Sequence, residues 1–121
     1  IMRRGEAVPR VGPDTLLADG LIEMSRKGLG MTVVVDAADQ VVGVYTDGDL
    51  RRALDQRIDV HQAHMHEVMT RGGRSVGERE LAATAVLLME KHRITALPVI
   101  GADGRLAGAL NVHDLLRAGV M

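Results

Sequence analysis

Two short polar motifs contain the side chains of this sequence that are best suited to holding a ligand. They are TDGD at residues 46–49 and NVHD at residues 111–114, and each directly follows an apolar run. In both motifs an acid stands three residues after a Thr or an Asn, where the pattern predicts the end of a strand and the start of a helix. Because free amides at a helix start favour an anion such as phosphate, each motif is a candidate anion-binding turn.

The same spacing has a structural explanation that needs no ligand. A Thr or Asn followed three residues later by an acid is typical of a capping box at a helix start. Thr46 or Asn111 would then accept a hydrogen bond from a helix amide. Asp49 or Asp114 would place negative charge in the first turn, where it stabilises the helix dipole. For one isolated motif this is the simpler interpretation.

Two further features favour binding. Gly43 and Gly108 stand three residues before the motif's Thr or Asn, and a glycine within a strand often marks close approach of another backbone or of a ligand. Arg51, Arg52 and Arg117 follow in the first turns, where a cation opposes the helix dipole. Such a local conflict is expected where function overrides stability. The alternative for the arginines is a solvated face or ion pairs with neighbouring aspartates.

The two motifs belong to an internal repeat, in which the chain matches itself at an offset of 65 residues without a gap from residue 20 to residue 119. Each copy begins with apolar residues at helical spacing, continues with two short apolar runs, and ends with the helix that starts at the motif. The predicted strands are 32–36 and 41–46 in the first copy, and 97–101 and 106–111 in the second. We assign residues 1–60 to repeat 1 with its lead-in, and 61–121 to repeat 2, in which 61–74 is a linker and lead-in. One unit of this size buries little surface alone, which gives a reason for the duplication.

The composition limits the classes of function. The chain has 121 residues, 46% apolar residues, a net charge of −1, no cysteine, and Tyr45 as its single aromatic residue. The charge argues against a nucleic-acid surface. No apolar run reaches the length of a membrane span and no signal peptide is visible, so we expect a cytoplasmic module without a membrane partner. The sequence starts at Ile1 with a run that is already under way, which indicates a fragment of a longer protein.

The tandem pattern Gly-x-x-Thr-x-x-Asp after two short strands resembles a cystathionine β-synthase (CBS) domain pair, also called a Bateman module. The resemblance covers nearly the whole chain. It implies an α/β fold of two pseudo-symmetric βαββα repeats packed through their sheets. It also implies a ligand cleft between the copies, along which the lead-in containing Met69 and Thr70 would run.

The resemblance also assigns roles to individual residues. Asp49 and Asp114 would receive ribose hydroxyls, while Thr46 would lie near phosphate; Asn111 departs from the usual Ser or Thr at the second such position. His113 directly follows the second cap, from where it would reach a phosphate or a sugar acid. The alternative is a surface histidine in the first turn of the helix. The candidate ligand-binding residues are Thr32, Val33, Thr46, Asp49, Arg51, Arg52, Leu97, Pro98, Val99, Asn111, His113 and Asp114, in which the strand residues would line a base pocket.

The strings GMTVVVD, TDGDLRRAL and HDLLRAGV more narrowly resemble the C-terminal half of arabinose 5-phosphate isomerases. Those enzymes join an N-terminal sugar isomerase domain to a CBS pair and serve the biosynthesis of Kdo and lipopolysaccharide. The resemblance implies that catalysis lies outside this chain, that no cofactor is required, and that CBS pairs form homodimers in a tetrameric parent. The implied regulatory ligand is CMP-Kdo, with AMP or ATP as the generic alternative. The rival hypothesis is a purely structural dimerisation or tetramerisation module with an empty cleft.

A group of histidines lies between the repeats. His61, His64 and His66 form H-x-x-H-x-H, but metal ligation needs convergent geometry and usually a third or fourth ligand. Because the segment is polar and contains no cysteine, we expect a solvated linker and no metal site.

Overall fold

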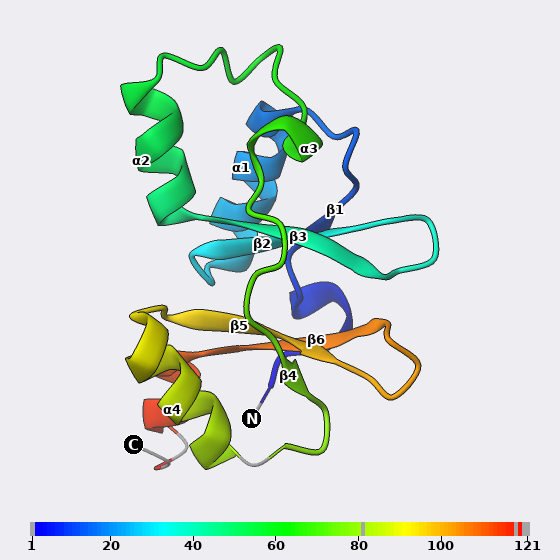
Figure 1. Cartoon of the computed structure of the whole chain (residues 1–121), viewed down its shortest axis with the longest axis vertical. Helices are drawn as coiled ribbons and strands as arrows, with labels where there is room; N and C mark the ends of the chain where they lie inside the picture. Colours follow the sequence, from blue (N-terminus) through cyan, green and yellow to red (C-terminus); the bar gives the residue numbers. More distant parts are fainter. Residues whose placement is uncertain (1, 81, 118, 120–121) are drawn as a thin grey trace. The chain divides into compact units, whose positions relative to one another are not determined.

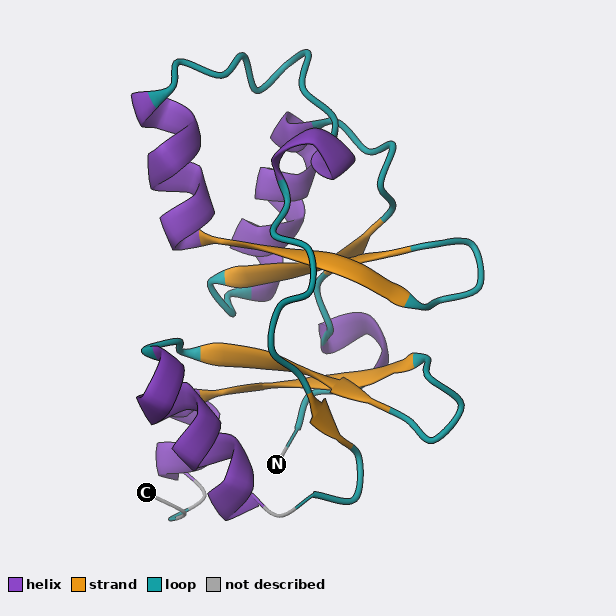
Figure 2. Cartoon of the chain, in the orientation of Figure 1, coloured by secondary structure: helices purple, strands orange, loops and turns teal. Residues whose placement is uncertain are grey.

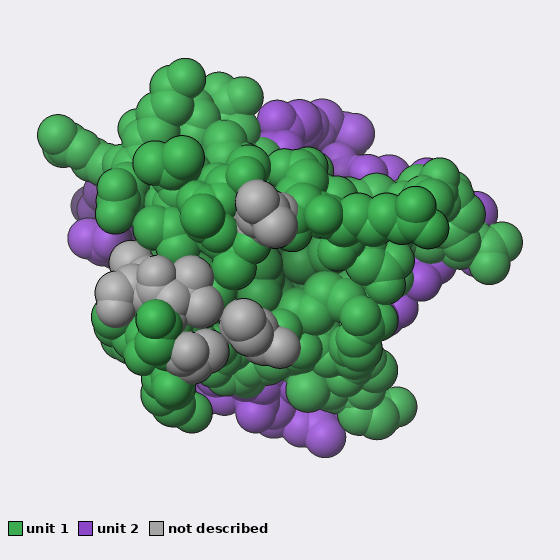
Figure 3. Space-filling model, turned by 90° about the horizontal axis from the view of Figure 1, so that it is seen from below, with its two compact units in different colours: residues 1–8, 74–121 green, residues 9–73 purple. Residues whose placement is uncertain are grey.

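The chain forms two compact units in a computed structural model that describes residues 2–80, 82–117 and 119. Unit 1 comprises residues 1–8 and 74–121, and unit 2 comprises residues 9–73 (Figure 3). The sequence assignment to repeats at 1–60 and 61–121 stays a prediction; the compact units divide the chain differently, since the first eight residues pack with the C-terminal half.

Unit 2 contains a three-stranded sheet with its helices on one face (Figures 1 and 2). The strand order is β1-β2-β3, in which β1 runs parallel and β3 antiparallel to β2. Its elements are β1 (Arg10–Val11), α1 (Leu17–Lys27), β2 (Met31–Val35), β3 (Val41–Thr46), α2 (Asp47–Asp55) and α3 (Met65–Val68).

Unit 1 repeats this arrangement with the order β4-β5-β6. Its elements are η1 (Gly5–Ala7), β4 (Val76–Gly77), α4 (Ala82–His92), β5 (Ala96–Ile100), β6 (Leu106–Asn111) and α5 (Val112–Arg117). Both sheets even have a register irregularity at the equivalent place, between Val34 and Val35 and between Val99 and Ile100. The predicted α/β fold of two like repeats is confirmed.

Each unit has its own hydrophobic core. In unit 2 the core includes Leu17, Met24, Val34, Tyr45 and Met65. In unit 1 the buried cluster among the described residues consists of Met89 and aliphatic side chains. Met65 comes from the segment expected to be a linker and lead-in, yet its side chain is completely buried. The described parts contain no helix with both the length and the apolar character needed to cross a bilayer.

A lead-in segment docks beside the second long strand of each unit. In unit 2, Thr70 and Val44 exchange two backbone hydrogen bonds of 2.8 and 3.0 Å. In unit 1, Arg3 and Ala109 exchange two of 2.8 and 3.1 Å. The lead-in at the start of the chain thus lies in the unit that contains repeat 2, and the lead-in before repeat 2 lies in the unit that contains repeat 1.

Candidate functional site

The start of α2 in unit 2 is a complete capping box. The Thr46 hydroxyl accepts from the Asp49 amide at 3.4 Å, and the Asp49 carboxylate accepts from the Thr46 amide at 2.9 Å. The capping interpretation of TDGD is therefore confirmed as local structure. It does not account for everything at this position, because Asp49 is only 6% exposed and its carboxylate has further donors.

The Asp49 carboxylate also joins two other parts of unit 2. Its Oδ1 accepts from the Thr70 hydroxyl at 2.8 Å and from the Arg52 guanidinium, one turn along α2. The Arg52 side chain is 64% exposed, so this ion pair has one buried and one solvated partner. Hydrogen bonds to an ionised acceptor are roughly twice as strong as neutral ones, so these donors hold Asp49 in one orientation. Thr46, Asp49, Arg52 and Thr70 are called the Asp49 corner below.

The start of α5 in unit 1 has the same plan with different partners. The Asn111 side-chain oxygen accepts from the Asp114 amide at 2.9 Å, as a helix cap does. The Asp114 carboxylate accepts from Arg3 Nε at 3.0 Å and from Arg3 Nη2 at 3.5 Å. Arg3 is the lead-in residue equivalent to Thr70, so the second aspartate has a cation where the first has a hydroxyl. Asn111, Asp114 and Arg3 are called the Asp114 corner.

The two strand glycines are explained by the docked lead-ins. A Cβ on Gly43 would lie 3.0 Å from the Thr70 carbonyl oxygen and 2.6 Å from the Met69 sulfur. A Cβ on Gly108 would lie 2.5 Å from the Arg3 carbonyl oxygen. Of the two explanations open at the level of sequence, close approach of another backbone is therefore the one that applies at both positions.

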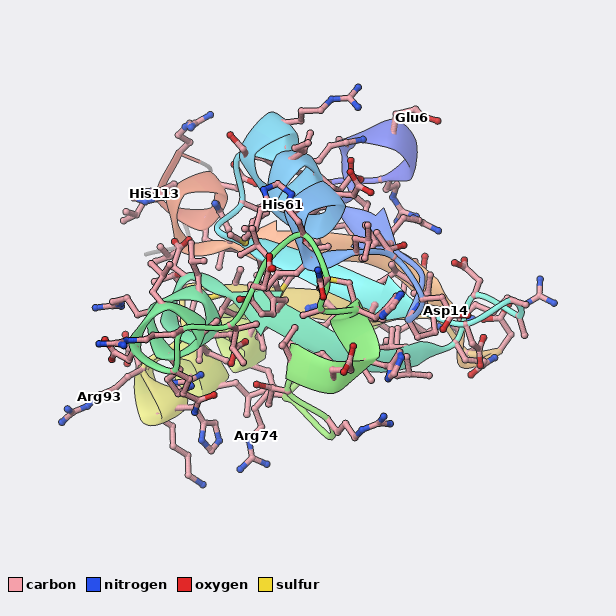
Figure 4. The ribbon with its side chains drawn as sticks, turned by 90° about the horizontal axis from the view of Figure 1, so that it is seen from above. Glu6, Asp14, His61, Arg74, Arg93 and His113 are labelled. Atoms are coloured by element: carbon pink, nitrogen blue, oxygen red, sulfur yellow. The ribbon has the colours of Figure 1, made fainter. Side chains whose placement is uncertain are left out.

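The remaining predicted residues on helices are exposed. Arg51 and Arg117 lie on exposed positions of α2 and α5. His113 is exposed on the first turn of α5, as Figure 4 shows. Of the arginines considered for an ion pair, Arg52 makes one with Asp49.

The predicted strand residues divide between the two faces of their sheets. Leu97 and Val99 belong to the core of unit 1. The Thr32 hydroxyl donates to the Gly20 carbonyl oxygen of α1 at 3.4 Å, so Thr32 faces the helices. Alternation along a strand places Val33 and Pro98 on the opposite faces of β2 and β5. Of the five, these two are therefore the ones turned away from the helical layer.

Tyr45 is a neighbour of the Asp49 corner that the sequence motifs did not identify. Its ring is buried, and its hydroxyl has no hydrogen-bond partner within the described part of the chain. Burial raises the pKa of Tyr45, and the Asp49 carboxylate raises it further, while Arg52 lowers it. The sequence feature that could have drawn attention to Tyr45 is that it is the single aromatic residue of the chain.

The histidine segment also has more structure than its sequence predicted. His64 is the N-cap of α3, and Glu67 completes a capping box with it. One ligand atom from each of His64, His66 and Glu67 lies within 4.8 Å of the others, whereas His61 is not in this group. Glu67 is outside the predicted group, because the motif H-x-x-H-x-H contains only histidines as ligands.

Comparisons with known proteins identify the family of this chain. The family model for the CBS domain matches residues 1–56 and 65–120. Arabinose 5-phosphate isomerase KdsD of Pseudomonas aeruginosa is 54% identical over all 121 residues, and KdsD of Escherichia coli K12 is 46% identical over the same span. The chain spans 37% of the length of each of these relatives.

Solved structures show the same fold. The CBS-pair protein CBSX2 from Arabidopsis thaliana is 26% identical with a TM-score of 0.81, over 98% of this chain and 90% of that one. A CBS domain protein from Pyrobaculum aerophilum complexed with AMP is 20% identical with a TM-score of 0.83, over 95% and 86%. The matched segments of this chain form a regulatory module, whereas the curated relatives, of which the chain spans only a part, are isomerases. The family model matches both halves of the chain, and the chain belongs to the CBS domain family as a tandem pair.

Proposed function

We propose that this chain is the ligand-sensing and assembly part of an arabinose 5-phosphate isomerase of Kdo and lipopolysaccharide biosynthesis. The identity of 54% to KdsD over the whole chain supports the parent. The isomerase domain would precede this chain in a cytoplasmic, tetrameric parent and would carry the catalysis. The ligand would be a nucleotide or nucleotide sugar, with CMP-Kdo as the first candidate and AMP or ATP as the alternatives.

The observation that carries the proposal is the set of donors around the Asp49 carboxylate. The Thr70 hydroxyl donates to Asp49 Oδ1 at 2.8 Å, and a ribose hydroxyl would make the same kind of bond. Exchanging one hydroxyl donor for another on a carboxylate costs little, because the charged acceptor stays satisfied. Asp49 would thus receive a ligand hydroxyl in place of that of Thr70, whose exposed side chain would rotate aside while its backbone stays paired with Val44.

The charge around α2 supports a phosphate nearby. Arg51 and Arg52 are exposed on its first turns, and a guanidinium fork matches the geometry of phosphate oxygens. Arg52 would keep one contact with Asp49 while its solvated side faces the anion. A protein of the same fold that was solved with AMP supports a nucleotide as the class of ligand.

The Asp114 corner would play a different part. Arg3 already neutralises Asp114 with two contacts of 3.0 and 3.5 Å, so a ribose hydroxyl would have to compete with a charged donor. We expect this corner to bind hydroxyls more weakly than the Asp49 corner. Alternatively, Arg3 and His113 would bind an acidic group of the ligand. Whether both corners border one cleft stays a prediction.

A nucleotide panel tests the proposal. Thermal unfolding of the chain would be followed with CMP-Kdo, CMP, AMP and ATP, each at about 100 times its Kd where binding is found. A ligand at that concentration adds about 2.7 kcal/mol to the free energy of unfolding. Stabilisation by at least one nucleotide, with unfolding unchanged by ribose 5-phosphate, supports a nucleotide sensor. No shift with any of the four contradicts it.

A second function, assembly without ligand, is favoured by exposed apolar side chains. Ile22 on α1 and Leu87 on α4 occupy equivalent positions of the repeat, and both are exposed, as are Leu54 and Leu116. Replacement of Leu87 by Glu should then lower the oligomeric state in sedimentation, and replacement of exposed Arg93 by Glu should not. An oligomer that survives Leu87→Glu together with Ile22→Glu would exclude these positions from the interface.

A further inference from the structure

The start of α3 in unit 2 gathers two imidazoles and a carboxylate. His64 Nδ1 lies 3.2 Å from Glu67 Oε1, and the rings of His64 and His66 are nearly parallel, with centroids 5.7 Å apart. One ligand atom from each of the three residues lies within 4.8 Å of the others. We propose that His64, His66 and Glu67 form a binding site for a divalent transition metal ion, of which Zn²⁺ is the best fit.

The donor types select the class of metal. Two imidazole nitrogens with one carboxylate are typical zinc ligands, whereas Ca²⁺ and Mg²⁺ prefer sites made of oxygen alone. At zinc–ligand bonds of about 2.1 Å, the ligand atoms of a tetrahedral site lie about 3.4 Å apart. The His64–Glu67 spacing of 3.2 Å already meets this value, and the remaining spacings, all within 4.8 Å, need a contraction of at most about 1.4 Å. All three side chains are partly solvated, so rotation about their bonds can supply that contraction.

The backbone beneath the site is fixed, although the side chains are mobile enough to adjust. The amide of Met65 donates to the Thr15 carbonyl at 2.8 Å, and the amide of His66 donates to the Pro13 carbonyl at 2.9 Å. The Met65 side chain is completely buried, and its sulfur lies 2.5 Å from the position a Cβ on Gly20 would take. The backbone that carries the ligands is thus held in place before the metal arrives, and only side-chain rotations remain to be fixed on binding, which limits its entropic cost.

A further carboxylate is within reach on the adjoining loop. Asp14 Oδ1 lies 4.0 Å from His66 Nε2, and the Asp14 side chain is 97% exposed. Asp14 would either complete a four-ligand site or hold the His66 ring in orientation, as carboxylates next to ligating histidines do. In both cases a bound ion would tie the loop at residues 13–15 to α3, and so restrain the lead-in that continues to Thr70.

Calorimetric titration of Zn²⁺ into chelator-treated chain without an affinity tag tests the site. We expect saturable binding of one ion per chain, no binding of Mg²⁺, and a visible absorption band when Co²⁺ is added. His66→Ala should weaken zinc binding at least tenfold. Glu67→Gln should also weaken it, while glutamine keeps the capping box with His64. The matched controls are His61→Ala and His113→Ala, which remove histidines outside the cluster and should leave the affinity unchanged.

The outcomes separate a specific site from loss of structure. Thermal unfolding without metal reports whether each variant folds, and added Zn²⁺ should raise the midpoint of the parent chain and not that of His66→Ala. The proposal is overturned if the parent chain shows no saturable binding up to about 1 mM Zn²⁺, which corresponds to about −4 kcal/mol. Unchanged affinity in a His64→Ala/His66→Ala double variant would overturn it equally.

Discussion

Thr70 and Asp49, 21 positions apart in the chain, are joined by a hydrogen bond of 2.8 Å from the hydroxyl to the carboxylate. The second repeat has an equivalent bond between Arg3 and Asp114 at 3.0 Å, across 111 positions. In each unit a docked lead-in therefore supplies the non-local partner of the motif's aspartate. The change from a neutral hydroxyl to a guanidinium makes the two corners chemically unequal, although their backbones are alike.

Asp49 should matter more for ligand binding than for folding. Asp49→Asn keeps the side chain's size but weakens its bonds to Thr70 and Arg52. We expect nucleotide affinity to fall at least a hundredfold, a loss of about 2.7 kcal/mol or more in binding free energy. The free energy of unfolding should fall by only about 1–2 kcal/mol. Calorimetry with a nucleotide and urea unfolding give the two quantities. Asp14→Asn, on a nearly fully exposed side chain, is the control. A loss of stability with unchanged affinity would restrict Asp49 to helix capping.

The Arg3–Asp114 pair should contribute measurably to stability. The two side chains are 26% and 13% exposed, so removing the guanidinium leaves a poorly solvated carboxylate. We expect Arg3→Gln to lower the free energy of unfolding by about 1–2 kcal/mol. Arg4→Gln is a matched control, because Arg4 pairs with Glu78 on the surface at 3.3 Å, and such pairs contribute about 0–1 kcal/mol. Equal effects of the two substitutions in denaturant unfolding would argue against a special role for Arg3.

The strand glycines should tolerate no side chain. Gly108→Ala brings a Cβ to 2.5 Å from the Arg3 carbonyl oxygen, so either the strand or the lead-in must move. We expect a loss of about 1–3 kcal/mol, measured by urea unfolding. Gly12→Ala is the control, since its nearest contact would be an ordinary 3.8 Å.

Gly43→Ala should differ from Gly108→Ala in one respect. Its shortest contact, 2.6 Å, is to the flexible Met69 side chain, while the Thr70 carbonyl oxygen lies at 3.0 Å. A second substitution, Met69→Ala, should therefore recover part of the stability lost in Gly43→Ala, as a double-mutant cycle would reveal. Strictly additive effects would show that the Met69 side chain is not what the added Cβ displaces.

Tyr45 should make stability depend on pH in the alkaline range. Burial and the Asp49 charge raise the pKa of Tyr45 in the folded chain, while an unfolded tyrosine ionises near pH 10. Above about pH 10 the unfolded state therefore loses a proton that the folded state keeps, and the free energy of unfolding falls as the pH rises. Tyr45→Phe should remove this dependence. Because Tyr45 is the only aromatic residue, phenolate absorbance reports its titration directly, and a normal midpoint would contradict the burial effect.

The same substitution should be nearly neutral at pH 7. The Tyr45 hydroxyl is buried and has no hydrogen-bond partner among the described residues. Removing such a group costs little, because no bond is lost and a desolvated polar atom disappears. We expect the free energy of unfolding to change by less than about 1 kcal/mol, or to rise. A larger loss would indicate that the hydroxyl binds a water molecule or another group in solution.

Local patterns predicted the local structure of this chain. The strands at β3 and β6 and the caps at Thr46 and Asn111 depend on residues within a few positions of one another, so period and capping rules identify them. The strand glycines are ambiguous in sequence, because a glycine in a strand allows close approach of either a backbone or a ligand. Only the docked lead-ins decide between the two.

The partners of the aspartates could not be predicted in the same way. Arg3 and Asp114 meet through the folding of nearly the entire chain, and no periodicity encodes such a contact. The partner of Met65 could not be predicted either, since its contact with Gly20 is made only in the folded unit. The site residues on the strands also need tertiary information, because alternation gives two faces without saying which one a ligand would use.

The most direct measurement is an NMR titration of the isotopically labelled chain with CMP-Kdo, CMP, AMP and ATP. For the ligand that binds, we predict that the largest amide shift changes fall on residues 46–52 and 69–71, and that Asp49→Asn abolishes them. Saturable binding whose shifts leave both segments unperturbed, or no binding of any of the four, would contradict nucleotide sensing at the Asp49 corner.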